Sequence, residues 1–125
     1  MCKHHDWLNF AKKIAEKSTF PKFRMAAIVT KSGRPLSSGW NKLSPGILKN
    51  PIYGEHQMLH AECQAILQLE PKQLRNATIY VAGLTRGGNL LLSKPCDACM
   101  FLIKQAVIKR IVFHTKEGEV VIENI

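Results

Sequence analysis

Two short segments of the chain carry side chains that bind transition metals. The first runs from His60 to Glu62, and the second runs from Pro95 to Cys99. Zinc binds imidazole nitrogen and thiolate sulfur, and a catalytic zinc site has three protein ligands and an open fourth position. His60, Cys96 and Cys99 supply such a set, because the three-residue step between the cysteines brings both sulfur atoms to one side of a helical turn. These residue types predict a catalytic zinc site.

Glu62 is predicted to transfer protons rather than to bind the metal, since three ligands are already present. Zinc lowers the pKa of its bound water from about 16 to about 7, which makes hydroxide available at neutral pH. A carboxylate two residues after His60 can carry a proton from that water to a substrate nitrogen and a leaving amine. Both segments begin predicted helices, whose N-terminal N–H groups and positive dipole end favour thiolate.

A structural zinc site is the alternative reading of the same residues. Cys63 follows His60 at the spacing that also separates Cys96 from Cys99, so one histidine and three cysteines could close a tetrahedron and leave no room for water. The protein would then be a non-catalytic module, and Glu62 an ordinary surface residue. If Cys63 is not a ligand, it is expected to be a small buried apolar residue of its helix.

The two segments lie within a series of alternating helices and strands. Apolar residues at three- and four-residue spacing predict helices over 6–17, 60–70 and 96–106. Runs rich in β-branched and apolar residues predict strands over 23–31, 36–40, 77–84, 90–92, 107–114 and 119–125. Residues 41–58 contain several prolines and glycines and predict a long irregular loop that serves a site or a lid. This order indicates a sheet with helices packed on its faces.

The composition predicts one globular domain over residues 1–125. Hydrophobic residues make up 46%, which excludes a disordered chain, and no apolar run approaches the roughly eighteen residues of a membrane span. The N-terminus does not resemble a secretory signal, so we expect a cytoplasmic protein whose four cysteines are metal ligands or thiols. Eighteen Lys and Arg against nine Asp and Glu give a net charge of +9, which favours phosphate-bearing small molecules or nucleic acid as partners.

Together, the two motifs resemble the signature of the zinc-dependent cytidine and deoxycytidylate deaminase superfamily, H-x-E followed by P-C-x-x-C. The order of the flanking elements is similar as well. The resemblance implies a three-layer α/β/α cytidine-deaminase-like fold with a mixed five-stranded sheet. It further implies one Zn²⁺ per chain, held by His60, Cys96 and Cys99, with Glu62 as the catalytic proton shuttle.

The resemblance also implies two contacts with the substrate. Asn41 would hold the nucleobase or its sugar, and the backbone of Ala61 would form a hydrogen bond with a base carbonyl. A turn residue after a strand is the alternative for Asn41. Trp40, Tyr53 and Phe101 are candidates for stacking on a base, or else for the core.

The C-terminal part of the sequence bears on the branch of the family. Only Lys116, Glu117 and Gly118 lie between the last two predicted strands, and a parallel pair needs a crossover of a dozen or more residues, so these strands must be antiparallel. This arrangement resembles the deaminases of free cytidine-type nucleosides. Histidine at position 60, and the lack of an acid soon after Asn41, resemble instead the deoxycytidylate and nucleic-acid deaminases.

We therefore predict a hydrolytic deaminase that converts a cytosine-type nucleoside or nucleotide to its uracil form and releases ammonia. A small free substrate is favoured because little beyond residues 41–58 remains to build a pocket. Deamination of bases in single-stranded DNA or RNA is the alternative that the net charge keeps open, although aromatic residues make up only 7%. No membrane partner is expected. The resemblance implies a homo-oligomer, since family members of this size often complete the pocket with a neighbouring subunit.

Overall fold

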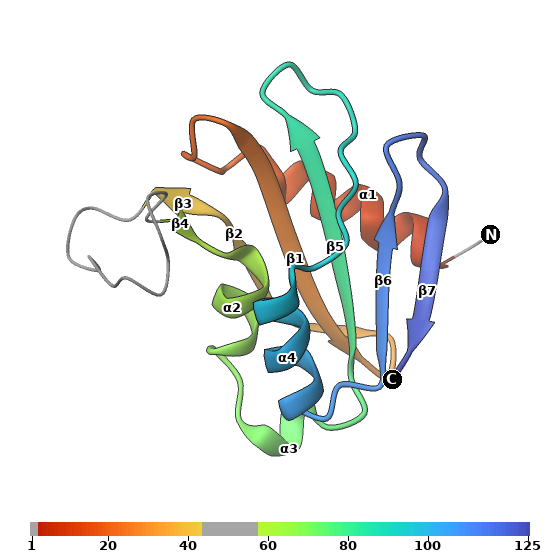
Figure 1. Cartoon of the computed structure of the whole chain (residues 1–125). Coiled ribbons are helices and arrows are strands. Elements are labelled where there is room, and N and C mark those ends of the chain that lie inside the picture. Colours follow the sequence, from red (N-terminus) through yellow and green to blue (C-terminus); the bar gives the residue numbers. More distant parts are fainter. Residues whose placement is uncertain (1–2, 44–57) are drawn as a thin grey trace.

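The computed structural model describes residues 3–43 and 58–125, and Figure 1 shows their arrangement. In chain order the helices and strands are α1 (Lys3–Ala15), β1 (Phe23–Lys31), β2 (Arg34–Trp40), β3 (Lys42–Leu43), β4 (Met58–Leu59), α2 (Ala61–Ile66), α3 (Pro71–Leu74), β5 (Thr78–Thr85), α4 (Asp97–Gln105), β6 (Arg110–His114) and β7 (Val120–Asn124). None of the helices in the two described ranges is long and apolar enough to cross a membrane.

Five of the strands form one mixed sheet in the order β2-β1-β5-β6-β7. β1 is antiparallel to both of its neighbours, whereas β5 and β6 are parallel. A parallel pair needs a long crossover, and here the segment that contains α4 provides it. β6 and β7 pair antiparallel, from Arg110 opposite Asn124 to His114 opposite Val120, which confirms the hairpin predicted from their short connection.

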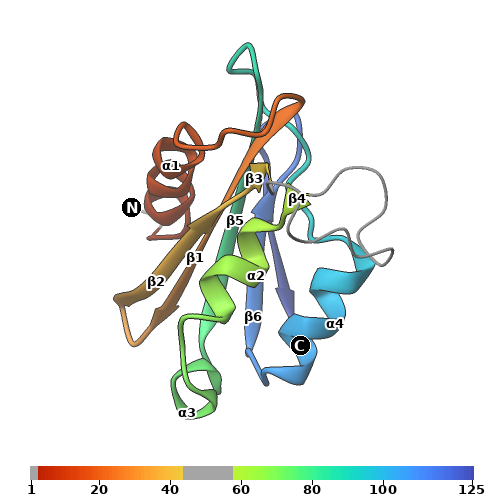
Figure 2. The same ribbon diagram turned by 90° about the vertical axis from the view of Figure 1, so that its left-hand side faces the viewer.

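The helices form the two outer layers of the structure. α1 packs on one face of the sheet, and α2 and α4 pack on the other (Figure 2). The buried side chains of α1, among them Leu8, Ala11 and Ile14, face the sheet. On the opposite face Ala65 of α2 and Ile103 of α4 belong to one buried cluster with the central strands. The predicted α/β/α fold with a mixed five-stranded sheet is confirmed.

The helix predicted over residues 60–70 is shorter in the structure. α2 ends at Ile66, and Pro71 begins the separate helix α3. Proline has no N–H to continue a helix but suits a first helical turn. Glu70 and Gln73 form a capping box around this start, in which the Gln73 side chain accepts a hydrogen bond from the Glu70 backbone N–H at 2.9 Å. The prediction missed this second start.

Two predicted strands also differ. The strand expected over 107–114 begins only at Arg110, because Val107 adopts a left-handed conformation with φ of 60° as the chain leaves α4. The strand expected over 90–92 is reduced to one bridge between Leu84 and Leu90. Within residues 41–58, β3 pairs with β4, which the sequence did not predict. The rest of that predicted loop, with Tyr53, lies outside the described residues.

Gly39 allows β2 and α2 to approach each other closely. A Cβ atom added at this position would lie 2.6 Å from the Ala61 carbonyl oxygen, 2.6 Å from Cβ of Gln64 and 2.8 Å from the Ala65 nitrogen. Two of these atoms belong to the backbone of α2, so they cannot rotate away as a flexible side chain would. The position of α2 on the sheet therefore depends on the absence of a side chain at Gly39.

We predict that Gly39→Ala destabilises the fold by about 1–3 kcal/mol, because the added methyl group pushes α2 away from β2. The measurement is the free energy of unfolding in urea. Gly87→Ala is the matched control, since the nearest atom to a Cβ at Gly87 is 3.8 Å away. Equal stability of the two variants would contradict this account of the contact.

Candidate metal centre and active site

His60, Cys96 and Cys99 meet because α2 and α4 contact each other and their N-terminal ends come close together. His60 is the N-cap residue of α2, Cys96 is the N-cap residue of α4, and Cys99 lies in the first turn of α4. Nδ1 of His60 lies 3.8 Å from Sγ of Cys96 and 3.4 Å from Sγ of Cys99. The three donor atoms all lie within 4.8 Å of one another.

This spacing fits a zinc ion. With Zn–N near 2.0 Å and Zn–S near 2.3 Å, nitrogen and sulfur ligands of a tetrahedral site lie about 3.5 Å apart, close to both measured distances. Imidazole with thiolates is also a donor set that suits zinc. In residues 3–43 and 58–125 this is the only group of three or more His, Cys, Asp or Glu side chains whose donor atoms lie so close together.

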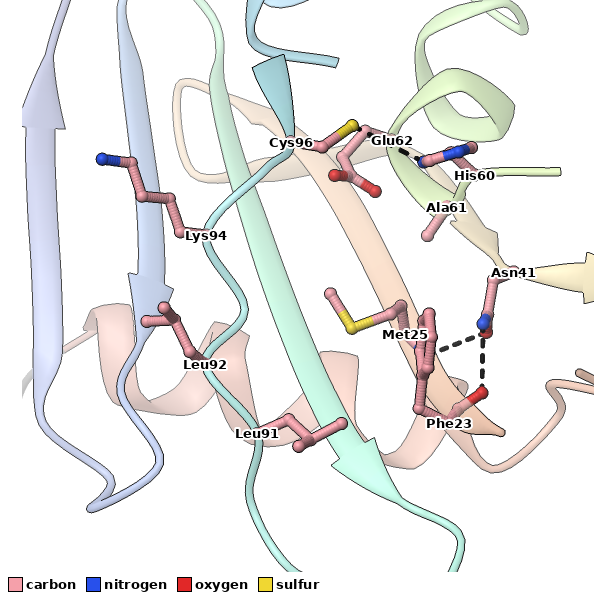
Figure 3. A pocket seen from close by; sticks show the side chains of 10 residues that line it. All are labelled: Phe23, Met25, Asn41, His60, Ala61, Glu62, Leu91, Leu92, Lys94 and Cys96. Carbon is pink, nitrogen blue, oxygen red and sulfur yellow. Dashed lines mark hydrogen bonds between the residues drawn. The ribbon is translucent and has the colours of Figure 1, made fainter. Parts of the chain in front are cut away.

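Glu62 lies beside the three donors and is 4% exposed. Burial raises the pKa of its carboxyl group, and a hydrogen bond with its own backbone and the nearby His60 and Cys99 partly oppose this rise. Figure 3 shows the carboxyl group directed into the cavity, near Cys96. A buried carboxyl group with a raised pKa suits a residue that both accepts and donates a proton.

A cavity of about 330 Å³ opens beside these residues, which is a size typical of sites for small molecules. Four segments that are separate in the sequence form its walls: the start of β1, Asn41 after the end of β2, residues 60–62, and residues 91–96 (Figure 3). The lining residues are Phe23, Met25, Asn41, His60, Ala61, Glu62, Leu91, Leu92, Lys94 and Cys96. Every predicted catalytic and substrate-binding residue thus lies at one cavity.

Asn41 is fully buried, and its side-chain amide forms hydrogen bonds with the backbone of β1. Its Oδ1 accepts a hydrogen bond from the Met25 N–H at 2.8 Å, and its Nδ2 donates one to the Phe23 carbonyl at 3.1 Å. The Asn41 backbone N–H also donates to the Met25 carbonyl at 3.1 Å. Asn41 therefore holds the end of β2 against β1, in addition to its place in the cavity wall.

Cys63 is half-buried beside Cys99 but does not belong to the group of three donors. A hydrogen bond from the Cys99 thiol lowers the pKa of Cys63. Cys63 thus lies next to one of the three donors without being within 4.8 Å of them all.

Of the aromatic side chains that the sequence singled out, Trp40 and Phe101 do not line the cavity, and Tyr53 lies outside the described residues. Trp40 contacts the ammonium groups of Lys17 and Lys42, at 5.1 and 4.8 Å from its ring centroid, and Phe101 is 65% exposed. Phe23, Leu91 and Leu92 line the cavity instead, and the sequence analysis missed them. For the two leucines a signal was present, because residues just before Pro95 and Cys96 must pass close to the metal ligands.

Comparison with protein families agrees with the motifs. The model of the cytidine and deoxycytidylate deaminase zinc-binding region matches residues 1–115. The chain belongs to this family. No curated protein matches the chain significantly.

Solved structures of deaminases share the fold. Cytidine deaminase from Burkholderia pseudomallei is 21% identical, with a TM-score of 0.70 over 99% of this chain and 93% of its own. A dCMP deaminase from cyanophage S-TIM5, in complex with dCMP and dUMP, is 18% identical, with a TM-score of 0.57 over 90% and 79%. RibD from Acinetobacter baumannii is 21% identical, with a TM-score of 0.63 over 90% of this chain, but the chain spans only 28% of that protein.

In this member of the deaminase family, a buried hydrogen-bond network holds the cavity segment around Leu91 and Leu92. The Ser93 hydroxyl donates to the Val81 carbonyl at 2.7 Å and accepts from the His114 N–H at 2.9 Å. Nε2 of His114 accepts a hydrogen bond from the Gly83 N–H at 3.1 Å, so Nδ1 carries the proton and donates to the Thr115 carbonyl at 3.0 Å. The ring is therefore held neutral.

We predict that this histidine makes the protein less stable in acid. Burial lowers the pKa of His114, aided by nearby Lys12 and opposed by the hydrogen bond to Thr115. Below about pH 6.5 the unfolded chain binds a proton at this residue that the folded chain does not, so stability falls as the pH falls, by at most about 1.4 kcal/mol per pH unit.

The measurement is the free energy of unfolding in urea at pH 7 and pH 5. His114→Gln can keep an acceptor near Gly83 without titrating, so the loss of stability between the two pH values should be smaller in this variant. His5→Gln, at an exposed position on α1, is the control. An unchanged pH dependence in His114→Gln would show that this ring is not the titrating group.

Proposed function

We propose that the protein is a zinc-dependent hydrolytic deaminase of a cytosine-type nucleoside or nucleotide. One observation carries the proposal: the buried carboxyl group of Glu62 lies beside the converging donors of His60, Cys96 and Cys99, at a cavity sized for a small molecule. The family match makes deamination the reaction for which this arrangement is expected.

In this proposal, Nδ1 of His60 and the sulfur atoms of Cys96 and Cys99 hold one zinc ion per chain. When bound, zinc supplies Lewis acidity and lowers the pKa of water toward 7. Three protein ligands leave one position open, which a hydrolytic reaction requires.

Glu62 carries the protons. Its carboxylate accepts a proton from the attacking water and delivers it to the ring nitrogen next to the amine-bearing carbon, while the water oxygen bonds to that carbon. Glu62 then takes the proton of the hydroxyl group now on that carbon and transfers it to the amine, so that a carbonyl forms, the carbon–nitrogen bond breaks, and ammonia leaves. The sum is cytosine plus water to uracil plus ammonia, and the raised pKa of Glu62 suits both directions of transfer.

The cavity walls orient the base. Phe23, Leu91 and Leu92 offer an apolar surface for the flat ring. We assign the backbone N–H of Ala61 to the base carbonyl, because Ala61 lines the cavity between the metal ligand and Asn41 (Figure 3). Asn41 is assigned to the base or its sugar through its position in the same wall.

Glu62→Gln is predicted to lower kcat by about 10²- to 10⁴-fold, since an amide cannot shuttle the proton. Bound zinc, measured by atomic absorption, should stay at one ion per chain, because Glu62 is not among the ligands. Glu117→Gln, in the exposed turn between β6 and β7, is the matched control and should keep full activity. Full activity of Glu62→Gln would refute the proposed mechanism.

Zinc content in cysteine variants separates the catalytic site from a structural one. Cys99→Ser should lose zinc and activity together, whereas Cys63→Ser should retain both. Loss of zinc from Cys63→Ser would instead establish a fourth ligand and support the non-catalytic module.

The substrate is tested by ammonia release from cytidine, deoxycytidine, their monophosphates and a cytosine-bearing single-stranded oligonucleotide. We expect turnover of a free nucleoside or nucleotide, abolished by chelation of the metal and restored by added zinc. Turnover of the oligonucleotide alone would replace the proposed substrate class, and ammonia release from none of these compounds would refute the proposal.

A further inference from the structure

A second cavity, of about 520 Å³, lies on the α1 side of the sheet. We call it the basic pocket, because Lys3, Lys31, Lys109 and Arg110 are among its lining residues. Three segments meet there: the first turn of α1, the turn between β1 and β2, and the adjoining starts of β5 and β6. The metal centre lies across the sheet, on the side of α2 and α4 (Figure 2), so the two cavities share no lining residue.

The basic pocket is strongly electropositive. Its lining includes four cationic side chains and no Asp or Glu. Within residues 3–43 and 58–125 the salt-bridge distance is met only between Lys94 and Glu123, so none of the four has a carboxylate partner there. Lys31 donates to the Lys72 carbonyl at 3.0 Å and Arg110 to the Asn124 side-chain oxygen at 3.2 Å, and both of these acceptors are neutral. The neighbouring acid is Asp6, which borders an adjacent hollow with Lys3, Trp7 and Gly33.

Aromatic groups form one wall of the same pocket. The rings of Trp7 and Tyr80 lie 6.1 Å apart, and the Tyr80 hydroxyl is 2.7 Å from Nδ1 of His4. Burial lowers the pKa of His4, and the nearby Arg110 lowers it further. His4 lies in the first turn of α1.

We propose that the basic pocket binds an oligophosphate, the group shared by inorganic tripolyphosphate and nucleoside triphosphates. The cations lie around the cavity on three separate segments, so together they can contact several linked phosphate groups at once. A single phosphate ion could not contact all of them. The volume also exceeds what a single phosphate needs and lies in the range of sites for ligands of nucleotide size. Tyr80 is buried, and the half-buried Trp7 is placed to contact a base attached to such a chain.

The test is isothermal titration of the zinc-loaded protein with tripolyphosphate, cytidine triphosphate, inorganic phosphate and uncharged cytidine. Lys3→Gln/Lys109→Gln removes two exposed charges from the pocket, and we expect about tenfold weaker binding of both triphosphates. Lys13→Gln/Lys116→Gln removes two exposed charges elsewhere and should change binding less than twofold. Thermal unfolding of each variant checks that it is folded.

Tighter binding of cytidine triphosphate than of tripolyphosphate would support a nucleotide in the pocket, and equal binding would support the phosphate chain alone. Equal loss of affinity in both double variants, or no loss in Lys3→Gln/Lys109→Gln, would overturn the proposal. Because the readout is heat of binding and not deamination, it is independent of the proposed function. Triphosphates can also chelate zinc, so the zinc content of the protein is measured after each titration. The Glu62→Gln variant is titrated in parallel.

Discussion

The metal centre depends on the close packing of two helix starts that are separate in the sequence. α2 and α4 each bury apolar side chains in one cluster on the same face of the sheet, and this packing brings the imidazole of His60 to two sulfur atoms. The hydrophobic effect has no preferred direction, so the relative position of the two helices must be fixed by the complementary shapes of the packed surfaces. Gly39 contributes to that shape, because the backbone of α2 occupies the space where a side chain at position 39 of β2 would lie. The chemistry of the site is thus set by packing between layers.

The cavity beside the metal centre shows the same dependence on distant parts of the chain. Residues 91–96 have little regular structure, yet the buried hydroxyl of Ser93 ties them to the backbone of Val81 in β5 and of His114 in β6. A site needs such supporting contacts, since a misplacement of about 1 Å is enough to impair catalysis. The sheet accordingly supports both the ligands and the wall that faces a substrate.

Much of this arrangement could be predicted from the sequence. The strand over 23–31 is correct to the residue, because an apolar run flanked by turn residues leaves little choice, and the hairpin of β6 and β7 followed from its short connection. The errors lie where one residue overrode a pattern: Pro71 starts a new helix and Val107 turns with a positive φ. The cavity wall at Phe23 could not be predicted, since it arises from strand register, which no local pattern encodes.

Asn41 supports the sheet and is also part of the cavity wall. Its amide takes the place of a peptide group beside β1, accepting from the Met25 N–H and donating to the Phe23 carbonyl, and the residue lines the cavity. A buried donor or acceptor left without its partner costs about 1–3 kcal/mol. A substitution of Asn41 that alters selectivity would therefore also weaken the contact between β1 and the end of β2. Leu91 and Leu92 are less deeply buried than Asn41. Substitutions at these two leucines can therefore change the shape of the cavity while the fold is retained.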